Sequence, residues 1–159
     1  MENRKTRKPN RLPGYDYAQS GAYFVTICTK DRQNLLSRIV KGEGDLSDAV
    51  DLTHAGEAVE AELLGINQIY RCVRVDSYVI MPNHVHMIFA IHEDTGQGST
   101  APKVSRIVQQ MKGAVSKRLG EAIWQKGYYD HVIRNEQDYL VKRRYIEENP
   151  LKWAQDEYY

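Results

Sequence analysis

The sequence has little cysteine and no long apolar run, and these shortages exclude two classes of protein. Only two cysteines occur in 159 residues, Cys28 and Cys72. Each lies in an apolar, strand-like segment, so a disulfide-stapled scaffold is not expected. No run approaches the ~18 consecutive apolar residues of a membrane-spanning helix. The first residues, MENRKTRKPNRLPGY, lack the apolar stretch of a secretory signal. We therefore expect a reduced, cytoplasmic protein with no membrane partner.

What the sequence does contain is enough for one ordinary globular domain. Hydrophobic residues make up 42% of the chain and charged residues 27%. A chain of this length and composition can bury one proper core but hardly two. We expect a flexible basic arm over residues 1–12, because Pro9 and dense charge disfavour regular structure there. A single globular domain over residues 13–159 is expected to follow.

Basic residues are gathered in two segments, although the formal net charge is only +1. Acidic residues are concentrated elsewhere, mostly in 43–63 and 121–148. A phosphate-binding face requires such segregation, although an ordinary solvated surface can produce it as well. The candidate phosphate contacts are Arg4, Lys5, Arg7, Lys8 and Arg11 in the arm, and Lys103, Arg106 and Lys112 in the second basic segment.

Hydrophobic periodicity predicts elements in the order β-α-β-β-α-β-α. The predicted strands are 21–30, 71–82, 84–91 and 127–135, the predicted helices are 53–69, 103–119 and 136–149, and 41–48 and 92–102 are predicted connections. The first six elements match the split β-α-β, or ferredoxin-like, arrangement. We therefore predict an α+β fold, with an antiparallel sheet, helices packed on one side and an additional C-terminal helix.

The segment MPNHVHMIFA, residues 81–90, places two histidines two positions apart in a predicted strand. Side chains alternate between the faces of a strand, so His84 and His86 should share one face. The apolar residues Val85 and Met87 should then point into the core. This spacing suits a pair of metal ligands, but two ordinary buried or surface histidines would satisfy it too.

The last predicted helix offers partners for these histidines. Tyr145 and Asn149 are four residues apart and share a helix face. If that face lies against the sheet, two imidazoles and an amide oxygen could hold Mg²⁺ or Mn²⁺. Tyr145 could then attack a phosphodiester and form a phosphotyrosine. Alternatives remain, because an asparagine before Pro150 is ordinary turn chemistry and the chain contains eleven tyrosines. Tyr139 shares the helix but lies about 120° around its axis from Tyr145.

Four segments together resemble one known family. They are RLPGYDYAQSGAYFVTICTKDR, SYVIMPNHVHMIF, YYDHVIRNEQDY and RRYIEENPLKW. They are similar to the REP-associated tyrosine transposases, which belong to the HUH (His–hydrophobic–His) single-strand endonucleases and transposases. The resemblance runs from about Arg11 to Trp153. The combination of MPNHVH with the later DY and YI..NP pattern is highly specific, whereas either half alone is weak.

The resemblance implies roles for individual residues. His84 and His86 match the metal ligands of the family, Asn149 matches a third ligand, and Tyr145 matches the single nucleophilic tyrosine. Family members use Mg²⁺ or Mn²⁺ and cut single-stranded DNA beside imperfect palindromic hairpins. They form a 5′-phosphotyrosine and release a 3′-hydroxyl. The basic arm resembles a segment that reads the flank of the hairpin, and relatives include monomers and homodimers.

Three functions remain open at this point. The first is a DNA-nicking and strand-transferring enzyme, favoured by the histidine pair together with Tyr145 and Asn149. The second is a non-catalytic module that binds structured single-stranded nucleic acid, favoured by the basic segments. The third is a metal-dependent hydrolase of small phosphoesters, which would need more carboxylate ligands than this constellation offers.

Overall fold

A computed structural model describes residues 21–40, 50–92 and 101–153 of the chain. The predicted basic arm, with the candidate contacts Arg4 to Arg11, lies outside the described residues. The predicted connection 41–48 and most of the connection 92–102 also lie outside them.

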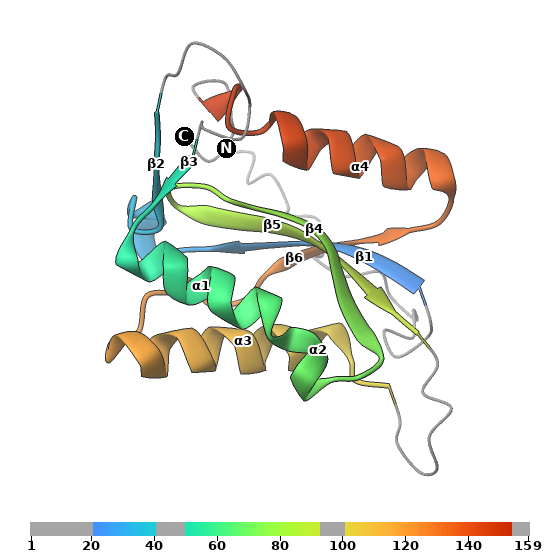
Figure 1. The fold of residues 1–159 in the computed structure, drawn as a ribbon, viewed down its shortest axis with the longest axis horizontal. Coiled ribbons are helices and arrows are strands. Elements are labelled where there is room, and N and C mark those ends of the chain that lie inside the picture. The colour runs from blue at the N-terminus through green and yellow to red at the C-terminus, as the bar shows by residue number, and fades with distance from the viewer. Residues whose placement is uncertain (1–20, 41–49, 93–100, 154–159) are drawn as a thin grey trace, which may run out of the picture.

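Four strands form one antiparallel sheet in the spatial order β4-β5-β1-β6 (Figure 1). They are β1 (Gly21–Cys28), β4 (Val73–Ile80), β5 (His84–Ile91) and β6 (Tyr129–Ile133). Strands β4 and β5 form the expected hairpin, closed by a 2.9 Å hydrogen bond from the Met81 amide to the His84 carbonyl. The first strand lies between the third and fourth strands of this sheet, as the ferredoxin-like arrangement requires. The predicted α+β class is therefore confirmed.

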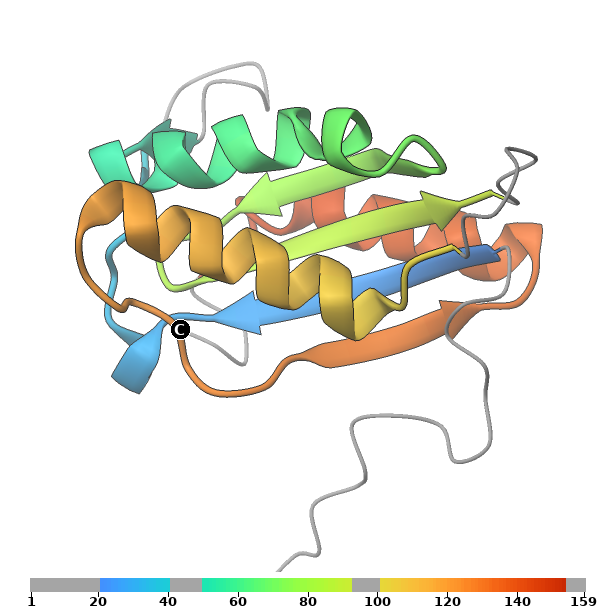
Figure 2. The ribbon, with the colours of Figure 1, turned by 90° about the horizontal axis from the view of Figure 1, so that it is seen from below.

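Helices cover both faces of the sheet. Helices α1 (His54–Leu64) and α3 (Val104–Leu119) pack side by side on one face. Helix α4 (Glu136–Glu148) lies across the opposite face, as Figures 1 and 2 show. No described helix is long and apolar enough to cross a membrane.

The alternation of side chains in β5 divides the interior into two clusters. Val85 and Met87 belong to the main core beneath α1 and α3. Ile88 lies on the other face, in a smaller cluster with Phe24 of β1 and Ile146 of α4. One strand therefore supports the core with one face and carries α4 on the other.

The structure corrects the predicted helix 53–69. It is two helices, α1 and α2 (Ile66–Ile69), separated by Gly65. Gly65 has φ −90° and ψ 0°, which lies in the right-handed region but away from regular helix values. The low helix propensity of glycine favours an interruption of the helix at this position. Thr53 precedes the helix as its N-cap, where its Oγ1 accepts a 3.2 Å hydrogen bond from the Gly56 amide.

Two short strands were missed by the sequence analysis. Strands β2 (Ser37–Ile39) and β3 (Val50–Leu52) pair as a separate antiparallel sheet. Three residues are too few to reveal a period of two, which explains the omission. The predicted strands 21–30, 71–82 and 127–135 are also shorter in the structure than their apolar patterns suggest.

Gly56 marks a close approach between α1 and the chain that precedes β2. A Cβ at this position would overlap the carbonyl oxygen of Leu36. We expect Gly56→Ala to lower the free energy of unfolding by about 1–3 kcal/mol, as overpacking does, measured by urea denaturation. Gly113→Ala in α3 is the matched control, because no atom lies within 4 Å of its Cβ position. It should raise stability by about 0.5–1 kcal/mol, and equal effects of the two variants would contradict the argument.

Candidate active site

The two histidines of β5 share the face of the sheet that α4 covers. His84 and His86 are buried, at 0% and 1% exposure. Their ring centroids are 4.5 Å apart, with the ring planes at 68°. The predicted common face is therefore confirmed, and two imidazoles meet in a site shielded from water.

Neighbouring polar side chains hold the two imidazoles in orientation. The Thr26 hydroxyl lies 2.7 Å from Nδ1 of His86, and Oδ1 of Asn83 lies 2.8 Å from Nδ1 of His84. A hydrogen bond at Nδ1 fixes the ring and makes Nε2 the nitrogen that coordinates a metal. Thr26 was missed by the sequence analysis because it lies on β1, sixty residues before His86.

Burial also controls the protonation of His86. Loss of solvent contact lowers the pKa of His86 well below its ordinary value, and the neighbouring His84 and the Lys142 ammonium lower it further. His86 is therefore neutral at physiological pH, which is the form that binds a metal ion.

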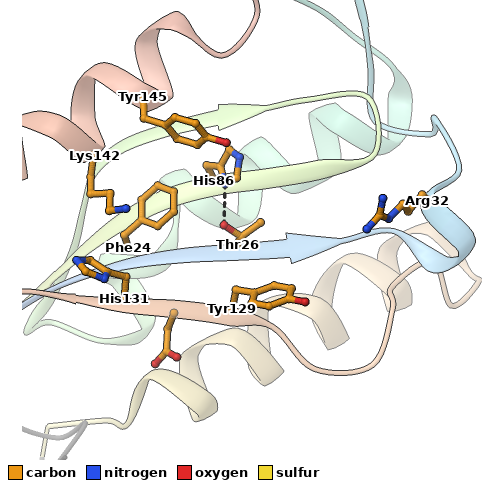
Figure 3. A pocket seen from close by; sticks show the side chains of 9 residues that line it. Phe24, Thr26, Arg32, His86, Tyr129, His131, Lys142 and Tyr145 are labelled. Atoms are coloured by element: carbon orange, nitrogen blue, oxygen red, sulfur yellow. Dashed lines mark hydrogen bonds between the residues drawn. The ribbon is translucent and has the colours of Figure 1, made fainter. Parts of the chain in front are cut away.

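Tyr145 reaches the histidine pair from α4. Its ring centroid lies 5.1 Å from that of His86 and 6.0 Å from that of Phe24. The side chain is 40% exposed, and Figure 3 shows its hydroxyl directed toward His86. The structure thus brings the candidate nucleophile to the two candidate histidine ligands, with the phenol partly open to solvent.

Asn149 ends α4 one turn after Tyr145. It is 3% exposed, and its buried Oδ1 makes no hydrogen bond to any other residue that the structure describes. Along the chain it stands between Tyr145 and Trp153, whose ring centroid lies 5.9 Å from that of His84. Both neighbours therefore contact the histidine pair, and Asn149 lies between them in sequence with a buried acceptor oxygen that has no partner in the described part of the chain.

These three side chains suit a divalent cation. Two imidazole nitrogens and one amide oxygen, if they met at one ion, would form a partial, neutral shell that leaves the charge of the ion uncompensated. The buried Oδ1 of Asn149 is a group that a ligand would satisfy. Among the described residues, no three His, Cys, Asp or Glu side chains gather in one place.

Helix α4 is fixed over the sheet at three points. Tyr139 donates a 3.4 Å hydrogen bond from its hydroxyl to Asp76, at a register shift in β4. Asp138 lies 2.8 Å from Nε2 of His131 on β6, and Ile146 is buried in the smaller cluster. These contacts set the height and rotation of α4, and thereby the position of Tyr145.

An open groove of about 460 Å³ runs past Tyr145 and His86 (Figure 3). It contains two cationic side chains, Arg32 and Lys142, that the sequence analysis did not single out. The pattern of Lys142 three residues before Tyr145 could have indicated one of them, but no local signal indicates Arg32. The lining residues are Phe24, Thr26, Arg32, His86, Tyr129, Asp130, His131, Lys142 and Tyr145.

The structure does not bring the basic residues of α3 to this groove. Lys103 caps α3 and Arg106 lies in its first turn, and α3 packs on the opposite face of the sheet (Figure 2). Lys112 donates from Nζ to the carbonyl oxygens of Gln125 and Gly127, and burial lowers its pKa. It therefore holds the segment that leads into β6.

The fold and the site define a class of protein, a ferredoxin-like domain with an extra helix that carries a tyrosine over a histidine pair. No family model matches the sequence. An uncharacterized protein of Haemophilus influenzae is 33% identical over 173 residues, covering 96% of this chain and 93% of that protein.

Two further comparisons carry a name. The REP-associated tyrosine transposase of Escherichia coli is 24% identical over 136 residues, covering 86% of this chain and 70% of that protein. A solved structure of a REP-associated tyrosine transposase bound to a REP hairpin has a TM-score of 0.67 at 21% identity, covering 92% of this chain and 76% of that one. Over most of its length the sequence is therefore similar to REP-associated tyrosine transposases, and its fold is similar to that of the solved one.

Proposed function

We propose that this protein is a metal-dependent endonuclease and strand transferase that cuts single-stranded DNA beside imperfect palindromic hairpins. The observation that carries the proposal is the 5.1 Å approach of the Tyr145 ring to the His86 ring at the floor of an open groove. The comparisons support a transposase-like function, and the solved relative is described as bound to a REP hairpin.

His84, His86 and Asn149 would hold Mg²⁺ or Mn²⁺. The ion would polarise the scissile phosphate and orient it for in-line attack. Thr26 and Asn83 fix the two imidazoles before the ion arrives. The ligand set is electrically neutral, so the site keeps its attraction for an anionic phosphate after the cation has bound.

Tyr145 would supply the nucleophile. Its phenolic oxygen attacks phosphorus and forms the new O–P bond while the bond from phosphorus to the 3′-oxygen breaks. The phenolic proton leaves to solvent, and the departing 3′-oxygen takes a proton from solvent. The products are a 5′-phosphotyrosine and a free 3′-hydroxyl. Reversal with another 3′-hydroxyl transfers the strand.

The remaining basic residues would contact the DNA away from the reacting phosphate. Lys103 and Arg106 are exposed on α3, across the sheet from Tyr145, and would neutralise phosphates of the hairpin rather than of the cut strand. The arm over residues 1–12 is proposed to contact the flank of the hairpin. Lys112 would have to leave two backbone carbonyls to bind a phosphate.

The proposal is tested by a denaturing gel. Protein is incubated with Mn²⁺ and a hairpin-flanked single strand that carries a label at its 5′ or its 3′ end. A metal-dependent band of protein–DNA adduct is expected only with the 3′ label, because the protein becomes linked to the 5′ phosphate. A native complex without any adduct would indicate a binding module instead.

The hydrogen bond from Thr26 to His86 should matter for metal affinity. Thr26→Val keeps the shape of the side chain but removes the hydroxyl that orients the imidazole. We expect Mn²⁺ affinity to fall by about 10- to 100-fold, measured by calorimetric titration. Ser37→Ala is the control, because it loses a buried 2.9 Å hydrogen bond to the Ile80 carbonyl away from the histidines. The control should lose stability and keep its affinity for Mn²⁺.

A further inference from the structure

We propose that Lys142 and Arg32 form a two-point clamp that binds backbone phosphates of the substrate strand on opposite sides of Tyr145. The inference rests on the proposed function, because it concerns the path of the strand through the same groove. Both side chains line this groove together with Tyr145 and His86.

Lys142 lies one turn before Tyr145 on α4. Its ammonium nitrogen is 5.1 Å from the centroid of the Phe24 ring, and the side chain is half-buried. It forms no ion pair with a residue in the described part of the chain. Its neighbour Arg143 differs, because it pairs with Glu147 at 3.1 Å. The charge of Lys142 reaches the Asp138 carboxylate one turn earlier, but no direct ion pair forms between the two. A partly desolvated ammonium beside an aromatic ring is suited to an incoming anion.

Arg32 enters the groove from a strained turn. It ends the short 3₁₀ helix η1 (Lys30–Arg32), where Asp31 and Arg32 have φ values of 55° and 53°. Left-handed backbone at two consecutive non-glycine residues is costly and persists only when the surroundings impose it. Here Asn83 donates from Nδ2 to the Arg32 carbonyl at 3.4 Å.

Asn83 connects this turn to the metal site. While Nδ2 holds the carbonyl of Arg32, Oδ1 lies 2.8 Å from Nδ1 of His84. One side chain therefore fixes both a candidate ligand and the backbone that places the Arg32 guanidinium. An arginine that only contacted solvent would not require a strained turn or the hydrogen bond from Asn83. A guanidinium that binds a phosphate at a fixed distance from the metal requires its backbone to be held in this way.

The two cations lie on opposite sides of the Tyr145 and His86 side chains in Figure 3. A single strand that crosses the reacting centre would thus meet one positive charge before it and one after it. Two contacts fix the line along which the strand crosses the reacting centre, whereas one contact would leave it free to pivot. The clamp therefore restricts the position of the scissile phosphate in front of Tyr145.

The test compares Lys142→Gln and Arg32→Gln with the matched control Arg143→Gln. Substrates carry one neutral methylphosphonate at a time, at each phosphate around the cleavage site. In the wild type, substitution on either side should slow adduct formation by about tenfold or more, as expected when one charge-assisted hydrogen bond is lost. Lys142→Gln should lose this sensitivity on one side only, and Arg32→Gln on the other, while Arg143→Gln should keep both.

Salt dependence and a charge-preserving variant give independent readouts. Each neutralising variant should reduce the slope of log affinity against log salt by about 0.7, and Lys142→Arg should restore it. Unchanged slopes and unchanged methylphosphonate sensitivity in both variants would overturn the clamp. If the wild type binds DNA but forms no adduct, the proposed function fails, while the salt slopes still decide whether the clamp exists.

Discussion

Tyr145→Phe is expected to abolish the covalent protein–DNA adduct and leave the binding of DNA and metal largely unchanged. The substitution removes only the hydroxyl. The phenyl ring that remains can keep its contacts with His86 and Phe24. A denaturing gel measures the adduct, and a native gel with the same DNA measures binding.

Two other tyrosines are the controls for this result. Tyr139→Phe changes a phenol on the same helix that only bonds to Asp76 at 3.4 Å, and it should still form the adduct. Tyr129→Phe changes the other tyrosine that lines the groove, and it should also remain active. An adduct that survives in Tyr145→Phe and disappears in Tyr129→Phe would move the nucleophile to β6.

Removal of the metal is expected to stop cleavage as completely as removal of the nucleophile. A chelator should abolish the adduct in the wild type, and Mn²⁺ or Mg²⁺ should restore it. Neither ion should restore it in His84→Ala or His86→Ala, because each variant lacks one of the two imidazoles that we propose as metal ligands. Adduct formation by either variant at the wild-type rate would contradict the assigned ligands.

Folding must be separated from metal binding in these variants. Both histidines are buried, and His86→Ala leaves the Thr26 hydroxyl without the imidazole, which should cost about 1–3 kcal/mol of stability. A metal-induced rise in melting temperature separates the two effects. At a concentration of 100 times the dissociation constant, the metal should stabilise the wild type by about 2.7 kcal/mol and the variants by much less.

His131→Ala provides the matched control for the metal experiments. His131 lines the same groove but is exposed and bonds to Asp138. This variant should keep most of the metal-induced rise in melting temperature, because the other two contacts still hold α4 over the sheet. An equal loss in His131→Ala would show that the metal binds at the groove wall rather than at the buried pair.

Local periodicity was sufficient for the parts of the site that belong to single elements. Residues two apart in a strand share a face whatever surrounds them, so His84 and His86 could be paired from the sequence. Residues four apart in a helix also share a face, so Tyr145 and Asn149 could be paired in the same way. The order of the elements likewise predicted the ferredoxin-like sheet. Gly65 shows the limit, because apolar spacing continued across a position where the helix breaks.

The assembly of these pairs into one site was decided by tertiary structure alone. Contacts of α4 with Asp76 and His131 place Tyr145 over the histidines, and β1 brings Thr26 to His86. Arg32 reaches the groove through a strained turn held by Asn83, fifty-one residues away in sequence. Such contacts depend on helix rotation, strand register and loop geometry. They leave no periodic trace in the sequence, because a period reports which face a residue occupies and not what that face meets.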